Sequence, residues 1–562
     1  MFDIDTAKET EKRKRRISFL LSILIPGLGQ FMRKRVASGL FFFIVFFSII
    51  WFVSNIWQVN YGLIGFFGGL LILYILNIID AYKGPSKVKA PCEVKCPVGI
   101  NIPLYSALIS KGMFDEALEI IRDRMPLPSV CGRICHHPCE TVCSLRKNND
   151  SLAIELLKRA ASDFGANKLS QIKNTKGMEK TIGIIGAGPA GLSTAYFLIR
   201  KGYFVTLYEK QKEPGGLLIY GIPEYRLPKD VVREDINFLK RLGIVIKTDV
   251  FIGEDITFSE LTRKHNALLI SIGNSRSTGI NIEGKELNGV YNALNFLMQS
   301  NKGNKPLLKG TVAVIGGGNS GFDAARTALR CGAENVTIYY RRNESEMPGN
   351  RKEMEMVLRE GIKVIYKTAP VKFLGKEKIN GVEFIRTELI KVKGKNRSEI
   401  KILEGTNFIT DVNMVIVATG QRPNLSFLPQ EVQNRIVKDM HIIVNPITME
   451  TCIKGIFAAG DINGLEKTVV DAIEMGRRAA DGIDWYLRGT GKIRKFIENL
   501  AKFDYPIQCK VTRMKSIKGK REQQKIVDKE KAVRTFGEVE MGFSREEAKK
   551  EASRCLQCNR RA

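Results

Sequence analysis

Two short apolar runs, each followed by a glycine-rich turn and a helix-like stretch, dominate the pattern in the middle of the chain. The runs Thr181–Ile185 and Thr311–Ile315 precede Gly186-x-Gly188-x-x-Gly191 and Gly316-x-Gly318-x-x-Gly321. Glycines at these spacings make a tight turn, admit a pyrophosphate and leave it at a helix N-terminus. The pattern therefore predicts an α/β fold with two Rossmann-like units and two bound nucleotides.

The two strands that follow the glycine turns lead into residues of opposite charge. Phe204–Tyr208 leads into Glu209, whose carboxylate suits the adenosine ribose of FAD. Asn335–Tyr340 leads into Arg341 and Arg342, and two guanidinium groups suit a ribose 2′-phosphate. NADPH is therefore favoured over NADH at the second unit. A solvated basic corner is the alternative for the two arginines.

Three uncharged stretches near the N-terminus predict a membrane anchor. Residues 36–57 and 61–79 are long enough to span a bilayer, whereas residues 17–32 are broken by Pro26 and Gly27 and favour a half-inserted segment. Basic clusters flank the stretches, and the positive-inside rule places these clusters in the cytoplasm. We expect a multi-pass protein of the cell membrane whose catalytic part is cytoplasmic.

The length and the charge of the chain indicate how many domains to expect and which partners suit them. The chain has 562 residues, of which 44% are hydrophobic and 26% are charged, so we expect three or four globular domains. The net charge of +29 suits acidic lipid or an acidic protein partner. Nucleic acid is not expected as a partner, because no recognised binding module accompanies the charge.

Eight of the eleven cysteines are clustered. They form Cys92-x3-Cys96, Cys131-x3-Cys135-x3-Cys139-x3-Cys143 and Cys555-x2-Cys558. Structural disulfides are not expected in the cytoplasm. Thiolates hold [4Fe–4S] clusters in sets of four, so eight thiols beside a flavin favour iron–sulfur clusters, with a structural zinc site as the alternative. Helical patterns in Ile102–Asp123 and Leu152–Phe164 place these cysteines on loops between helices.

Longer motifs resemble one enzyme family. The stretches Cys92–Asp163, Glu213–Pro228, Tyr340–Pro348 and Gly455–Asp461 are similar to the small (beta) subunit of glutamate synthase. The same arrangement occurs in the N-terminal half of dihydropyrimidine dehydrogenase and in electron-bifurcating NADPH:ferredoxin oxidoreductases. The resemblance covers roughly residues 88–562. It implies an FAD- and NAD(P)-dependent iron–sulfur oxidoreductase.

The resemblance also implies roles for individual residues. FAD would be held by Gly186, Gly188, Pro189, Ala190, Gly191, Glu209, Gly216, Leu217, Gly460, Asp461, Thr468 and Val469. NADPH would be held by Gly316, Gly318, Asn319, Ser320, Gly321, Arg341 and Arg342. The cofactors carry out hydride transfer, so no catalytic acid, base or nucleophile is expected from the chain.

Two [4Fe–4S] clusters follow from the same resemblance. In the family a Cys-x2-Cys pair precedes the first domain, whereas here the matching stretch Glu551–Cys558 stands at the C-terminus, so we expect the tail to fold back. One cluster would use Cys92, Cys143, Cys555 and Cys558, and the other Cys96, Cys135 and Cys139. Where relatives offer Glu or Gln this chain has Lys158, a poor ligand while protonated. Cys131 is the expected substitute.

The expected organisation is a membrane hairpin (1–84), a helical iron–sulfur domain (85–170), an FAD domain in two parts (178–295 and 410–488), an NAD(P)H domain (296–409) and a basic tail (489–562). The expected function is a membrane-anchored oxidoreductase that passes electrons from NADPH through FAD to the clusters, and on to a redox protein or large-subunit partner. The alternatives are a redox-dependent docking or sensory module, or the electron-input subunit of a glutamate synthase-like or ferredoxin:NADP complex.

Overall fold

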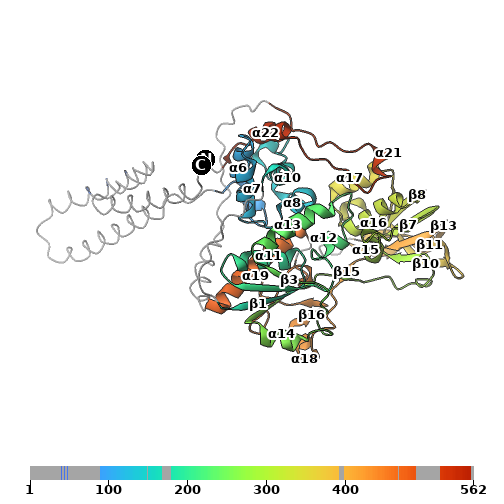
Figure 1. The fold of residues 1–562 in the computed structure, drawn as a ribbon. Helices are drawn as coiled ribbons and strands as arrows, with labels where there is room; N and C mark the ends of the chain where they lie inside the picture. Colours follow the sequence, from blue (N-terminus) through green and yellow to red (C-terminus); the bar gives the residue numbers. More distant parts are fainter. Residues whose placement is uncertain are drawn as a thin grey trace, which may run out of the picture. The chain divides into compact units, whose positions relative to one another are not determined.

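The chain divides into two units, Met1–Lys89 and Ala90–Ala562. The computed structural model describes residues 40, 44, 47, 89–147, 150–166, 179–390, 398–465, 468–488 and 519–558. The helices and strands labelled in Figure 1 belong to the second unit.

The predicted membrane location is contradicted. Over the described ranges, no helix combines the length and the apolarity that crossing a bilayer requires. Residues 17–32, 36–57 and 61–79, on which the prediction rested, lie outside the described residues except for positions 40, 44 and 47. An uncharged stretch of sufficient length is necessary for a spanning helix but does not by itself establish one. The prediction of a multi-pass membrane protein is therefore wrong for the part of the chain that the structure describes.

A five-stranded parallel sheet forms the centre of the first dinucleotide-binding domain. Its strand order is β18-β4-β1-β2-β3. The strands are β1 (Thr181–Ile185), β2 (Phe204–Tyr208), β3 (Val245–Lys247), β4 (Ala267–Ile270) and β18 (Ile456–Ala458). Every residue of β4 is buried, as expected for a parallel strand covered on both faces. Helix α11 (Pro189–Ile199) packs against α19 (Val469–Arg488), so two distant segments of the chain complete this domain.

A second five-stranded parallel sheet lies between these two segments in the sequence. Its order is β6-β14-β7-β8-β9, so β7 takes the central place that β1 takes in the first sheet. The strands are β6 (Val290–Asn292), β7 (Thr311–Ile315), β8 (Asn335–Tyr340), β9 (Lys363–Tyr366) and β14 (Met414–Val417). The helices are α15 (Ala293–Asn301), α16 (Asn319–Arg330) and α17 (Arg351–Arg359). An antiparallel sheet follows, formed by β10 (Thr368–Gly375), β11 (Ile379–Ile390), β12 (Glu399–Ile402) and β13 (Phe408–Asp411).

Shorter elements connect the sheets. The helices are α12 (Leu217–Tyr220), α13 (Lys229–Arg241), α14 (Phe258–Lys264), α18 (Gln430–Ile436) and α21 (Lys529–Ala532). The two-stranded pairs are β5 (Arg276–Ser277) with β15 (Gln421–Arg422), and β16 (Val437–Lys438) with β17 (His441–Ile442). The chain passes between the two dinucleotide-binding domains twice, and the β5–β15 pair links these two connecting segments.

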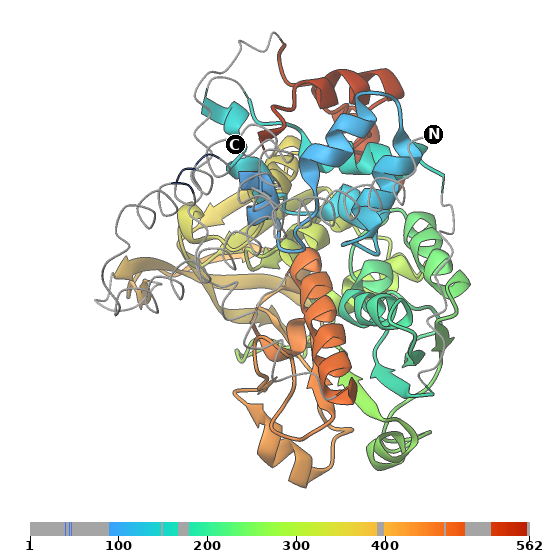
Figure 2. The same ribbon diagram turned by 90° about the vertical axis from the view of Figure 1, so that its left-hand side faces the viewer.

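A helical domain precedes the first sheet. It contains α5 (Pro91–Lys95), α6 (Ile102–Ile109), α7 (Phe114–Arg122), α8 (Pro128–Ile134), α9 (Pro138–Thr141) and α10 (Ile154–Phe164). The helical pattern predicted over residues 102–123 is divided into α6 and α7, because Gly112 has a φ of +75° that ends the first helix. The tail helix α22 (Arg545–Ser553) packs against α6 and α10, and Figure 2 shows it (red) beside α6 (blue) and α10 (cyan).

The tail also crosses the second dinucleotide-binding domain. Arg330 Nε on α16 donates to the carbonyl of Thr535 at 2.9 Å, and the Val539 N–H donates to the carbonyl of Tyr225 at 3.1 Å. Arg159 on α10 donates to the carbonyl of Glu540 at 2.7 Å. The tail therefore connects three parts of the second unit that the sequence separates.

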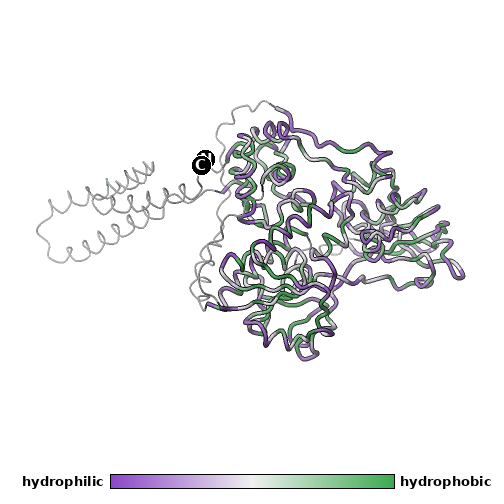
Figure 3. The backbone as a smooth tube through the Cα atoms, in the orientation of Figure 1, coloured by the Kyte–Doolittle hydropathy of each residue, from purple (hydrophilic) through white to green (hydrophobic). Residues whose placement is uncertain are grey.

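Apolar stretches run through the interior of the second unit, as the green segments of Figure 3 show. One continuous core joins the helical domain to the first parallel sheet, and a separate core lies within the second domain. The predicted α/β class, with two Rossmann-like units and an α-helical domain before them, is confirmed.

Candidate functional site

The first glycine turn has the geometry of a pyrophosphate cradle. Gly186 has a φ of +98°, and a Cβ there would lie 2.7 Å from the carbonyl oxygen of Ser271. A Cβ at Gly191 would lie 2.1 Å from the Gly186 carbonyl oxygen, whereas one at Gly188 would meet nothing within 4 Å. The turn is therefore tightly packed at Gly186 and Gly191. At Gly188 it has free space, next to the start of α11 at Pro189.

The second glycine turn repeats this construction. Gly316 has a φ of +130°, and a Cβ at Gly321 would lie 2.7 Å from the Gly316 carbonyl oxygen. A Cβ at Gly318 would again meet nothing within 4 Å. The Asn319 side chain accepts from the Asn350 N–H at 2.7 Å, and Ser320 Oγ accepts from Gln421 Nε2 at 3.4 Å. Both predicted loops thus have room for a phosphate at the start of a helix.

Glu209 lies beneath the first turn. Its side chain is 6% exposed, and its two carboxylate oxygens accept the N–H groups of Ala187 and Gln211, both at 2.9 Å. Burial raises the pKa of Glu209, while these two hydrogen bonds lower it. The carboxylate is held in place with lone pairs left for a ribose hydroxyl.

The two arginines after β8 are not equivalent. Arg342 forms an ion pair with Glu346 at 2.8 Å, and it also donates to the Ser398 carbonyl. The side chain of Arg341 is exposed, and within the described part of the chain no carboxylate pairs with it. Arg341 is therefore the guanidinium that is available to a 2′-phosphate, and Arg342 is already engaged.

Two further predicted segments meet at the first turn. A Cβ on Gly216, where φ is +56°, would lie 3.2 Å from the Cα of Gly188, and α12 begins at the next residue, Leu217. A Cβ on Gly460 would lie 3.1 Å from the Cβ of Ala190, which places the neighbouring Asp461 close to the start of α11. These approaches bring segments more than 200 residues apart to one place.

The last predicted FAD-binding segment is the start of α19. The Thr468 hydroxyl accepts from the Asp471 N–H at 3.3 Å and donates to the carboxylate of Asp471. This is the side-chain capping expected at a helix N-terminus. The free N–H groups of the first turn, beginning at Val469, form a region of positive potential.

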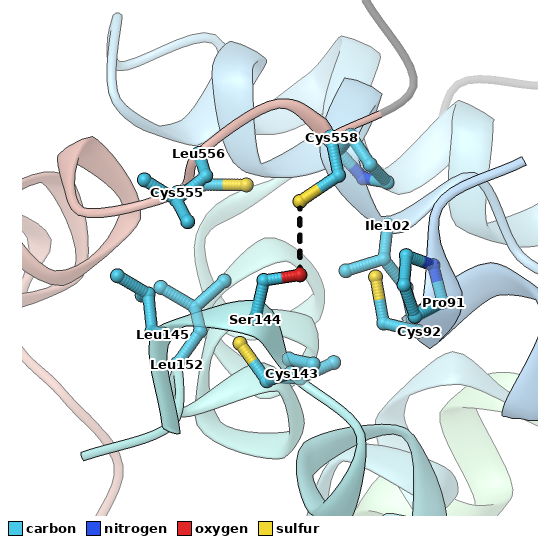
Figure 4. A pocket seen from close by; sticks show the side chains of 12 residues that line it. Pro91, Cys92, Ile102, Cys143, Ser144, Leu145, Leu152, Cys555, Leu556 and Cys558 are labelled. Atoms are coloured by element: carbon cyan, nitrogen blue, oxygen red, sulfur yellow. Dashed lines mark hydrogen bonds between the residues drawn. The ribbon is translucent and has the colours of Figure 1, made fainter. Parts of the chain in front are cut away.

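Four of the predicted cysteines line one pocket. Figure 4 shows Cys92, Cys143, Cys555 and Cys558 around it, and Cys558 Sγ donates to Ser144 Oγ at 3.4 Å. Apart from Ser144, the rest of the lining is apolar: Pro91, Ile102, Pro103, Leu145, Leu152, Ile154 and Leu556. A set of four thiols inside an apolar shell is the donor set of a [4Fe–4S] cluster.

Buried polar contacts fix the tail at this pocket. Glu551 is fully buried, and its carboxylate accepts from the Ala153 N–H at 2.9 Å and from Arg554 at 2.7 Å. Gln557 donates to the Pro103 carbonyl at 2.7 Å. The roles of Glu551 and Arg554 were missed at the level of sequence, although both lie within the stretch that matches the family motif.

Burial keeps the thiols of the pocket neutral until a metal binds. Burial raises the pKa of Cys555 to about 11, and burial also raises the pKa of Cys92 well above its ordinary value. Without a metal these thiols stay protonated, and thiolates form only when positive charge binds. Across the described ranges no three His, Cys, Asp or Glu side chains lie close enough to share one ion. In a [4Fe–4S] cluster each thiolate binds a different iron, so this spacing is compatible with a cluster.

The remaining predicted cysteines lie around α8, α9 and the end of α5. Cys131 is fully buried, and Cys135 and Cys139 are 8% and 6% exposed. The His137 N–H donates to Cys135 Sγ at 3.4 Å. Burial raises the pKa of Cys139, and Cys96 and Cys135 are the neighbouring thiols that raise it further. Cys96 ends α5, which packs against α9, the helix that holds Cys139, and Cys131 lies one helical turn before Cys135.

An ionic network that the sequence interpretation missed joins the two dinucleotide-binding domains. Arg226, in the loop before α13, donates from Nη1 to both carboxylate oxygens of Asp323 on α16 at 2.8 Å, and its Nη2 pairs with Glu353 on α17. Arg326 on α16 pairs with Glu360 at 2.8 Å. Arg226 belongs to the family-like stretch Glu213–Pro228, so the signal was present, but no local pattern indicated its partners.

Two family models match the chain. Residues 180–476 match the pyridine nucleotide-disulphide oxidoreductase model, and residues 85–169 match dihydropyrimidine dehydrogenase domain II, 4Fe–4S cluster.

Curated relatives match over most of the chain. The NADPH-Fe(3+) oxidoreductase subunit beta of Geobacter sulfurreducens is 35% identical over 87% of this chain and 78% of that protein. The NADP(+)-dependent formate dehydrogenase subunit beta of Moorella thermoacetica is 35% identical over 84% of this chain and 71% of that protein. The glutamate synthase [NADPH] small chain of Azospirillum brasilense is 34% identical over 71% of this chain and 86% of that protein.

Proposed function

Because the chain belongs to the pyridine nucleotide-disulphide oxidoreductase family, as an NADPH-dependent enzyme with FAD and 4Fe–4S domains, we propose that it is an electron-transfer subunit. Electrons would pass from NADPH through FAD to two [4Fe–4S] clusters, and from there to a partner protein. FAD takes two electrons as a hydride and releases them singly to an acceptor of single electrons. The observation that carries this proposal is the pocket that Cys92 and Cys143 share with Cys555 and Cys558.

The residues of this chain would bind and orient the two nucleotides. The turn at Gly186–Gly191 would hold the FAD pyrophosphate, Glu209 its ribose, and Gly216, Leu217 and Asp461 the flavin side. The first turn of α19, from Thr468 and Val469, would place N–H groups where the reduced flavin carries negative charge. No side chain has to move a proton for hydride delivery.

The second turn, Gly316–Gly321, would hold NADPH together with Asn319, Ser320 and Arg341. The exposed guanidinium of Arg341 supports the preference for a 2′-phosphate, since a charge-assisted bidentate contact is possible there. Arg342 would act on the same site indirectly, by holding Glu346 away from the phosphate.

A partner chain is part of the proposal. The Geobacter and Moorella relatives are named as beta subunits, and the Azospirillum relative as a small chain. We extend this to the present chain, which would supply electrons to a larger subunit or to a redox protein.

An anaerobic titration with NADPH tests the proposal. Flavin absorbance should bleach, and EPR signals from two reduced clusters should follow. Cys558→Ser should remove one cluster signal and about half of the iron, whereas Cys452→Ser, at an exposed lone cysteine, should change neither. Zinc in place of iron, or bleaching with no cluster signal in the unaltered chain, would contradict the proposal.

A further inference from the structure

Helix α12 begins beside the glycine turn that would hold FAD. It starts with Gly216 and Leu217, the residues proposed to line the flavin. The Gly215 N–H donates to the Ala187 carbonyl at 2.8 Å, and a Cβ on Gly216 would lie 3.2 Å from the Cα of Gly188. One hydrogen bond and close backbone packing therefore tie the start of α12 to the turn.

Side chains of two other helices bind the carbonyl groups at the far end of α12. The last carbonyls of a helix have no partner within it. Lys229, at the start of α13, is 6% exposed and donates to the Leu218 carbonyl at 3.0 Å and to the Ile222 carbonyl. Asn301, at the end of α15, donates from Nδ2 to the Tyr220 carbonyl at 3.0 Å and to the Ile222 carbonyl at 3.2 Å. The Ile222 carbonyl thus accepts from both helices.

These two donors come from different domains. Val232 and Ile236 of α13 belong to the apolar core that includes the first parallel sheet. Phe296 and Leu297 of α15 belong to the core of the second domain, and α15 packs against α16, the helix that starts in the second glycine turn. Helix α12 itself packs against both α13 and α15 (Figure 1). Asn301 therefore connects the second domain to a helix of the first.

Tyr220 takes part in this connection with its side chain as well. The Nζ atom of Lys302, the residue after Asn301, lies 5.5 Å from the centre of the Tyr220 ring. The Tyr220 hydroxyl accepts from the Glu213 N–H at 3.0 Å. Lys302 is exposed, whereas Asn301 is half-buried, so water competes less for the contacts of Asn301. The end of α15 therefore contacts α12 through a carbonyl group and through a ring.

From these contacts we propose that Asn301 is a positioning residue for hydride transfer. Its carboxamide fixes α12, and with it Gly216 and Leu217, at one place relative to the domain that would bind NADPH. The inference rests on the proposed function. Hydride transfer requires the two reacting rings at a short and fixed distance, and a small misplacement removes much of the rate.

The chemistry of the side chain decides which variants are informative. The Nδ2 group of an asparagine carries two N–H donors, and Asn301 directs Nδ2 to two carbonyl oxygens. An ionised aspartate has nearly the same shape but only acceptors, so it would place a negative charge beside those oxygens. Asn301→Asp therefore separates the donors from the shape, and Asn301→Ala removes both.

Anaerobic stopped-flow reduction of the flavin in the full chain tests the inference. At saturating NADPH, Asn301→Ala and Asn301→Asp should each reduce the flavin about tenfold more slowly. Flavin content per chain and the dissociation constant for NADPH should stay unchanged. Hydrogen exchange of the α12 amides should accelerate in the oxidised protein, and the visible circular dichroism of the bound flavin should change.

Asn304→Ala is the matched control. Asn304 lies three residues later, is exposed, and donates to Gln299 of the same helix at 3.1 Å. This variant should match the unaltered chain in the rate of flavin reduction, in hydrogen exchange of α12 and in circular dichroism.

Other outcomes would overturn the inference. An unchanged saturating rate in Asn301→Ala does so and leaves the proposed function standing. A full rate in Asn301→Asp also does so, because the donors would then be dispensable. Weaker NADPH binding with an unchanged saturating rate would assign Asn301 to nucleotide binding instead of positioning. An unaltered chain whose flavin is not reduced by NADPH overturns the proposed function itself.

Discussion

The two dinucleotide-binding domains have similar sheets, but they contact the rest of the second unit in different ways. Each has a five-stranded parallel sheet with a glycine turn after its central strand. The first sheet shares one apolar core with the helical domain. The second has its own core, and it meets its neighbours through a small apolar cluster around Tyr225 and through buried ion pairs. Apolar burial makes the FAD and iron–sulfur parts one body, whereas directional charges set the orientation of the second domain.

Removal of Arg226 is expected to have the largest effect on this difference. Arg226→Met leaves the buried carboxylate of Asp323 without its cation and leaves Glu353 with Arg326 alone, a change that typically costs about 3–5 kcal/mol. Hydrogen exchange in α16 should accelerate accordingly, while exchange in α11 should stay unchanged. Hydride transfer from NADPH should slow, because the orientation of the second domain is no longer fixed.

Arg233→Met is the matched control. Arg233 pairs with Glu213 and Asp230 on the surface, where such pairs contribute less than about 1 kcal/mol. Equal effects of the two substitutions would refute the view that buried charges attach the second domain.

The glycine turns allow the same substitution to be made in both domains. Gly191→Ala and Gly321→Ala force a Cβ to within 2.1 Å and 2.7 Å of a carbonyl oxygen, a crowding that costs roughly 1–3 kcal/mol. The first variant should be purified with less flavin, as measured by absorbance per chain. The second should keep its flavin and bind NADPH more weakly. Flavin loss in both variants would mean that the two turns do not serve separate nucleotides.

The two arginines after β8 test how the second domain recognises NADPH. Arg341→Ala should weaken NADPH binding about tenfold, or about 1.4 kcal/mol, and leave NADH binding unchanged. Arg342→Ala should have a smaller direct effect, because Arg342 is paired with Glu346. Dissociation constants for both nucleotides, measured on the oxidised enzyme, separate these outcomes. A larger loss in Arg342→Ala would reverse the assignment.

Glu209 is expected to give the smallest effect. Glu209→Gln removes one hydrogen-bond acceptor, so FAD affinity should fall by about 1 kcal/mol. Because burial raises its folded-state pKa, the flavin-free protein should lose stability as the pH rises from the ordinary carboxyl pKa through the raised value. The Gln variant should lack this pH dependence when thermal unfolding is followed across that range. An identical profile in both proteins would exclude Glu209 as its source.

Local patterns were sufficient for much of the fold. The strands Thr181–Ile185 and Thr311–Ile315 and the turns that follow them are predictable because an apolar run and a positive-φ glycine are properties of adjacent residues. The division of residues 102–123 at Gly112 could also have been anticipated from that glycine. The convergence of Cys555 and Cys558 on Cys92 followed only from the order of motifs in a known family.

Contacts between distant charges could not be predicted in this way. Arg226 lies about 100 residues from Asp323, and Glu538 lies about 400 residues from Arg133, yet each pair is in direct contact. Charge pairing depends on where folded surfaces meet, which no local periodicity records. The membrane prediction was wrong for a different reason. It used a local property alone, the absence of charge along a stretch of the sequence.

The distance in sequence between the four thiols of the first pocket has a consequence during protein synthesis. Cys143 leaves the ribosome about 400 residues ahead of Cys555, a delay of roughly 20–80 s at typical rates of elongation. During that interval the nascent chain contains only two of the four thiols, those of Cys92 and Cys143. The cluster proposed at this pocket can therefore be completed only after Cys555 and Cys558 have been synthesised.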